Sequence, residues 1–117
     1  MDVGTQLTAL ADPTRRAIFE LLRAQPRAVG ELSSKVPVSQ PAVSQHLKVL
    51  REAALVRSHP VGASRVYEVD GDGLLVLRDW LDSMWDQALD AFVDAAHRPD
   101  PVGETSPPGG PSPNPLP

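Results

Sequence analysis

Apolar side chains recur at helical spacing over the first 34 residues and predict three helices. Asp12 and Pro13 mark the start of the second helix, because aspartate caps helices well and proline is tolerated at the first helical position. Pro26 ends it. A short third helix is expected at about residues 29–34. The inward positions expected on the three helices are Val3, Leu7 and Leu10, then Ala17, Ile18, Leu21 and Leu22, then Val29 and Leu32.

The stretch PVSQPAVSQHLKVL, residues 37–50, predicts a fourth helix that runs to about Glu52. Ser39 is expected to cap it, and Pro41 lies early enough to lose no needed hydrogen bond. Its buried stripe is predicted to be Val43, Leu47 and Leu50. The opposite face is polar and has no acidic residue before Glu52, which raises the question of what that face contacts.

The pattern then changes to short runs of β-prone residues. Residues 55–59 and 64–69 predict two strands, and residues 60–63, which include Gly62, predict the turn between them. The sequence Asp70-Gly71-Asp72-Gly73 ends the second strand, and Asp72 is expected to cap the next helix. The sequence thus predicts a β-hairpin between two helical regions.

The last predicted helix runs from about Gly73 to His97 and has a wide apolar stripe. This stripe comprises Leu74, Leu77, Leu81, Met84, Trp85, Ala88, Leu89, Phe92 and Ala96. It is wider than a small domain needs to cover, so we expect a partner helix in a two-fold dimer. The alternative is that it packs back on the first two helices.

Residues 98–117 hold eight of the chain's 13 prolines and are predicted to be a disordered tail. Residues 1–97 are then predicted to form one domain for DNA binding and dimerisation.

The charge of the chain is unevenly distributed. The whole chain carries a net charge of −4, which argues against a nucleic-acid binder. Residues 35–65, however, hold five basic side chains and one acidic one, whereas residues 66–97 hold eight acidic side chains and one basic one. The basic segment contains the fourth helix and most of the hairpin. The lack of cysteine, of a long apolar run and of a signal-like start predicts a cytoplasmic protein.

The order of elements predicts a mainly α winged helix-turn-helix fold, with four helices, a two-stranded wing and a long C-terminal helix. In this arrangement the second helix of the motif enters the major groove of DNA. Its neutral polar side chains can pair with base edges, and its cations can contact phosphates. Arg57 and Arg65 add cations on the wing. The predicted DNA-contacting residues are Ser39, Gln40, Pro41, Ser44, Gln45, Lys48, Arg51, Arg57 and Arg65.

Three segments carry a family resemblance. ALADPTRRAIFELL (9–22), AVGELSSKVPVSQPAVSQHLKVLREAALV (28–56) and SRVYEV (64–69) resemble the ArsR family of winged-helix bacterial transcriptional regulators. The resemblance implies a homodimer, joined through its first and last helices, that binds a double-stranded DNA operator with two-fold symmetry. It also implies that residues 55–69 form the wing. We expect a repressor and not an enzyme, since no arrangement of serine, histidine and carboxylate looks catalytic.

Many relatives in this family sense metals. The absence of cysteine excludes thiolate sensing in this chain. Asp90, Asp94 and His97 share one helix face and could hold nickel, zinc or cobalt. The paired histidine spacing of the family site is missing, however. We therefore favour the interpretation that these residues are simply a solvated helix face. A further alternative is a winged-helix protein-interaction module whose acidic last helix or proline-rich tail binds a partner protein. A DNA-binding regulator with a protein co-regulator is also possible.

Overall fold

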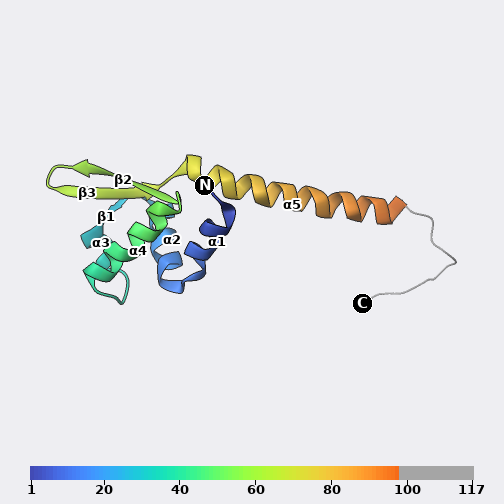
Figure 1. Ribbon diagram of the computed structural model, residues 1–117. Coiled ribbons are helices and arrows are strands. Elements are labelled where there is room, and N and C mark those ends of the chain that lie inside the picture. The colour runs from blue at the N-terminus through green and yellow to red at the C-terminus, as the bar shows by residue number, and fades with distance from the viewer. Residues whose placement is uncertain (98–117) are drawn as a thin grey trace. The chain divides into compact units, whose positions relative to one another are not determined.

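The computed structural model describes residues 1–97, and the chain divides into two units, residues 1–82 and 83–117. Helix α5 begins in the first unit and continues into the second (Figure 1). The described elements, in chain order, are α1 (Val3–Ala11), α2 (Pro13–Ala24), β1 (Arg27–Ala28), α3 (Val29–Ser33), α4 (Gln40–Glu52), β2 (Val56–Val61), β3 (Ser64–Val69) and α5 (Gly71–His97). The predicted fold class, a mainly helical winged helix-turn-helix with a long C-terminal helix, is confirmed. The predicted tail lies outside the described residues.

Side-chain caps fix where the helices begin. The Asp12 carboxylate accepts a hydrogen bond from the Arg15 backbone N–H at 2.9 Å, and Pro13 is the first residue of α2. The Ser39 hydroxyl accepts one from the Ala42 N–H at 3.3 Å, so both predicted caps are confirmed. The expected cap at Asp72 is wrong. Helix α5 begins two residues earlier than predicted, and it is Asp70 that accepts from the Gly73 N–H, at 3.1 Å.

The core of the first unit lies among helices α1 to α4 and the start of β2. Three of its side chains come from the predicted stripe of α4, and each is 0% exposed. The buried apolar residues are Ala9, Ile18, Phe19, Leu22, Leu32, Val43, Leu47, Leu50, Ala53, Leu55 and Val56. Burying these side chains is the main favourable contribution to folding of the unit. The faces of α4 were therefore predicted correctly from spacing alone.

The inward faces of the first two helices differ in part from the prediction. On α1 the buried residues are Gln6 and Ala9, whereas Leu7 is 41% exposed. On α2, Phe19 is buried and Ala17 is exposed. The predicted Ile18 and Leu22 of α2 are nevertheless buried and Leu21 packs against the core, so the face of α2 is largely confirmed. The main difference lies on α1, where Leu10 packs against the core but Gln6 and Ala9 are the buried residues.

The sheet has three antiparallel strands in the order β1-β3-β2. The sequence did not predict β1, because two residues are too few to form an alternating pattern. Strand β2 extends through Pro60 and Val61, so the loop of the hairpin is only Gly62-Ala63. Gly62 has a φ of +60°, which suits the first central position of a two-residue hairpin turn. The predicted four-residue turn was therefore too long by two residues.

A buried junction joins α1, the end of α4 and the start of α5. Gln6 is 0% exposed, and its amide nitrogen donates hydrogen bonds to the carbonyl oxygens of Ala53, at 3.2 Å, and Gly73, at 2.8 Å. Ala54 follows α4 with a φ of +58°, and its carbonyl lies against Gly73. The C-terminal end of α4 is thus held by contacts from two other helices.

From Arg78 onward, every described side chain of α5 is exposed. This includes large apolar residues of the predicted stripe, such as Trp85 at 65% and Phe92 at 71%. No helix among the described residues is long and apolar enough to cross a membrane.

Candidate nucleic-acid interface

The core positions α4 by one face and leaves its other face open to solvent. Helices α3 and α4 are joined by residues 34–39, and Leu32 of α3 is buried in the same core as the stripe of α4. At the N-terminal end of α4, five of the predicted DNA-contacting residues are all exposed. They are Ser39, Gln40, Pro41, Ser44 and Gln45. The side-chain amides of Gln40 and Gln45 and the hydroxyl of Ser44 can donate and accept hydrogen bonds, which is the chemistry that reading of base edges requires.

Two cations follow on the same side of α4. Lys48 and Arg51 come four and seven residues after Ser44, and both are exposed. Among the ion pairs formed within residues 1–97, neither side chain has a carboxylate within 4.0 Å. Both cations are therefore available to an outside anion, such as a DNA phosphate.

The cations of the wing are already engaged within the wing. The Arg57 guanidinium lies 3.0 Å from a Glu68 carboxylate oxygen on the neighbouring strand. His59 Nδ1 is 4.0 Å from the same oxygen. Arg65 donates to the hydroxyl of Ser58 at 2.9 Å. Sequence reasoning missed Glu68, because the expected four-residue turn would have placed Val66 opposite Arg57, whereas the two-residue loop places Glu68 there.

Histidines take no central part in this surface. His46 lies on α4 and is half-buried, whereas His59 is exposed on β2.

At the start of α2, the hydrogen bond from the Arg15 backbone N–H holds the pKa of Asp12 below its ordinary value of 3.8. The positive charge of Arg15 acts in the same direction. Asp12 is therefore a charged cap at neutral pH.

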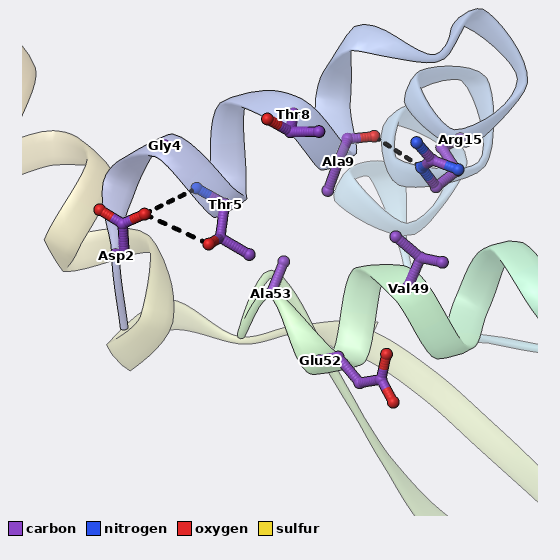
Figure 2. A pocket seen from close by; sticks show the side chains of 9 residues that line it. All are labelled: Asp2, Gly4, Thr5, Thr8, Ala9, Arg15, Val49, Glu52 and Ala53. Carbon is purple, nitrogen blue, oxygen red and sulfur yellow. Dashed lines mark hydrogen bonds between the residues drawn. The ribbon is translucent and has the colours of Figure 1, made fainter.

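A pocket of about 470 Å³ opens between α1 and the C-terminal end of α4 (Figure 2). It is lined by Asp2, Gly4, Thr5, Thr8, Ala9, Arg15, Val49, Glu52 and Ala53. Two of its polar side chains already form hydrogen bonds within the protein. Asp2 caps α1 by accepting from the Thr5 N–H at 3.2 Å, and Arg15 Nε donates to the Ala9 carbonyl at 2.8 Å.

The predicted metal ligands lie on the last turns of α5. His97 Nδ1 is 3.0 Å from the backbone carbonyl oxygen of Val93. Within residues 1–97, the side chains of histidine, aspartate and glutamate form no group of three that could hold a metal ion. Metal binding by Asp90, Asp94 and His97 stays a prediction.

Comparison with known proteins decides the family. Residues 10–59 match the family model described as a helix-turn-helix domain. The chain is 57% identical over 85 residues to the HTH-type transcriptional regulator Rv2034 of Mycobacterium tuberculosis, a match that covers 73% of this chain and 79% of that protein. It superposes on the crystal structure of an ArsR family transcriptional regulator with a TM-score of 0.65 at 27% identity, covering 72% of this chain and 92% of that one. The chain belongs to the ArsR family of helix-turn-helix transcriptional regulators.

A more distant relative of this ArsR-family protein is the transcriptional repressor SdpR of Bacillus subtilis. The two are 30% identical over 73 residues, which cover 62% of this chain and 81% of SdpR. Membership in the family confirms that the protein is a DNA-binding transcriptional regulator and not an enzyme. The individual DNA-contacting residues stay predictions.

Proposed function

We propose that this ArsR-family regulator is a dimeric repressor that recognises a palindromic operator with the first turns of α4. The observation that carries the proposal is the division of α4 into two faces. Val43, Leu47 and Leu50 are 0% exposed. Gln40, Ser44 and Gln45 are exposed and neutral, so they can form hydrogen bonds with bases and repel no phosphate.

Contacts to the DNA backbone would position this helix in the groove. Lys48 and Arg51 are exposed on α4, and Arg65 is exposed on β3. Such cations supply affinity for any sequence and fix the register of the protein on the duplex. Bases would then be read by Gln40, Ser44 and Gln45. On this proposal the residues of α4 differ in role although they lie on one surface.

The exposed apolar side chains support a homodimer through α1 and α5. Leu7 of α1 is 41% exposed, and Trp85 and Phe92 of α5 are 65% and 71% exposed. Apolar surface of this kind is favourably buried against a second copy. A two-fold dimer presents two copies of α4, which favours an operator with two similar halves in opposite orientation. Residues 1–97 would then serve as one domain for DNA binding and dimerisation.

Repression is the proposed direction of control, and it is supported by the relative SdpR, which is named a transcriptional repressor. A dimer seated on an operator blocks access of other proteins to the same DNA. A promoter carrying the selected operator should therefore give less transcript in vitro when the protein is added. An increase in transcript would contradict repression while leaving operator recognition intact.

Selection of bound duplexes from a random pool tests operator recognition directly. We expect an imperfect palindrome, bound more tightly than random DNA when both are titrated at the same salt concentration. The variants Gln40→Ala and Ser44→Ala should change the selected sequence. Lys48→Ala should instead weaken binding to every duplex and lower the slope of log affinity against log salt by about 0.9.

Three outcomes would contradict the proposal. Equal affinity for selected and random duplexes would show that α4 does not read sequence. Equal losses on both duplexes for all three variants would contradict the division of roles along α4. A monomer without DNA affinity would instead favour a protein-interaction module.

A further inference from the structure

The wing of this protein holds a carboxylate at the point where a DNA-binding surface gains from cations. Glu68 on β3 is the register partner of Arg57 on β2, so the two residues face each other across the hairpin. The Arg57 Nε atom lies 3.0 Å from a Glu68 carboxylate oxygen. The Arg57 side chain is 59% exposed and that of Glu68 is 27% exposed. The cation is thus reachable from solvent, whereas its anion is more buried.

The carboxylate and a DNA phosphate compete for the same group. A guanidinium binds either anion through paired N–H donors in similar geometry. The guanidinium side of the pair is open to solvent, so a phosphate can approach Arg57 and compete with the carboxylate. This competition lowers the gain that Arg57 brings to DNA binding.

The other cation of the wing provides a contrast within the same hairpin. Arg65 donates to the hydroxyl of Ser58, a neutral group, at 2.9 Å. A neutral acceptor neither cancels the charge of Arg65 nor repels a phosphate. A phosphate must therefore displace a charged carboxylate to reach Arg57 but only a neutral hydroxyl to reach Arg65.

We propose that Glu68 limits the affinity of this regulator for DNA by holding Arg57 in an ion pair within the wing. Arg57 is then a weak phosphate contact in the natural protein, and removal of the Glu68 charge turns it into a strong one. This inference rests on the proposed function in that the wing must approach the DNA backbone. It does not depend on recognition of any operator, because phosphate contacts are independent of sequence.

A double-mutant cycle on the full chain tests the proposal. The variants are Glu68→Gln, Arg57→Gln and the double variant, and each is titrated against a random duplex at about 50 and about 200 mM salt. Glu68→Thr provides a second neutral side chain with a high preference for strands. Thermal unfolding confirms that each variant is folded before its affinity is compared.

We expect Glu68→Gln to bind more tightly than the natural protein and to have a salt slope steeper by about 0.9, which is the value for one added phosphate contact. Its advantage should shrink by about threefold between the two salt concentrations, because a fourfold rise in salt weakens one such contact by that factor. Arg57→Gln should weaken binding less in the natural protein than in the Glu68→Gln background, where it should abolish the gain.

Two results would overturn the proposal. The first is an unchanged affinity in both Glu68 variants. The second is a gain that persists in the double variant, since that gain would come from general loss of negative charge and not from release of Arg57. Failure of operator recognition is a separate outcome, because it appears as equal affinity for selected and random duplexes in the natural protein.

Discussion

Asp12 illustrates how one side chain fixes the start of a helix and makes its stability depend on pH. Its carboxylate accepts the Arg15 N–H at 2.9 Å, and this hydrogen bond lowers its pKa from 3.8. A carboxyl group whose pKa is lower in the folded state binds fewer protons than in the unfolded state. Its stabilising effect is therefore complete above pH 3.8 and is lost as the pH falls through the lower folded value.

We predict that Asp12→Asn makes the protein less sensitive to acid. Asparagine keeps the capping oxygen but does not titrate in this range. The free energy of unfolding of the natural protein should exceed that of the variant at pH 6, and the difference should disappear as the pH falls below 3.8. Urea unfolding at several pH values measures this difference. A difference that is constant with pH would contradict the assigned role of the Asp12 charge.

Single residues could be predicted from the sequence where their role is local. The caps at Asp12 and Ser39 depend on residues no more than three positions away, and both were predicted. Gln6 and Glu68 were missed because their partners are distant in the sequence. Gln6 bonds to residues 53 and 73, and the pairing of Glu68 with Arg57 requires the length of the hairpin loop.

At the scale of helices and strands, prediction succeeded where one apolar stripe dominates. Helix α4 has such a stripe, and its bounds and buried face agree with the sequence. In α2 the predicted Ile18 and Leu22 are also buried, and only Phe19 takes the place expected for Ala17. In α1 the pattern is weaker, and the tertiary packing selected Gln6 over Leu7. For the candidate site, the sequence thus located the exposed side of α4 but not the interactions that hold the end of that helix.

The junction between α4 and α5 depends on a glycine. A Cβ added at Gly73 would lie 1.6 Å from the Ala54 carbonyl oxygen, so backbone must shift to accommodate it. We predict that Gly73→Ala lowers the free energy of unfolding by about 1–3 kcal/mol or more, as overpacking does in other cores. Thermal and urea unfolding measure the loss.

Gly71→Ala is the matched control, since a Cβ at Gly71 would meet no atom within 4 Å other than those of its chain neighbours and of the adjoining helix backbone. It lies in the same turn of α5, where alanine favours the helix, and should leave stability unchanged or raise it by about 0.4–1 kcal/mol. Equal destabilisation by both substitutions would indicate a general intolerance of alanine in this turn and would contradict the role of the close contact.

At the scale of the whole molecule, local charge matters more than total charge. The chain is acidic overall, with a sequence pI of about 5.2. Its basic residues nevertheless collect in residues 35–65, which contain α4, β2 and the start of β3, whereas its acidic residues collect in residues 66–97. Exposed charges more than about 8–10 Å apart are largely screened at physiological salt, so the cations of α4 act on a nearby phosphate more strongly than the total charge suggests. A net negative charge is therefore compatible with a DNA-binding regulator.

The proposed dimer predicts different effects for the two faces of α5. Phe92 is 71% exposed on the apolar face, and Asp86 is exposed on the acidic side of the same helix. We predict that Phe92→Glu shifts the protein from dimer to monomer in sedimentation experiments, because a charge replaces apolar surface that the dimer buries. Asp86→Asn should remain dimeric.

The same two variants connect assembly with DNA binding. A monomer carries one α4 and can occupy one half-site at a time, so Phe92→Glu should bind a palindrome hardly more tightly than an isolated half-site. Asp86→Asn should keep the preference of the natural protein for the complete palindrome. If Phe92→Glu is monomeric and still prefers the palindrome as strongly as the natural protein, then two-fold pairing through α5 is not what sets the form of the operator.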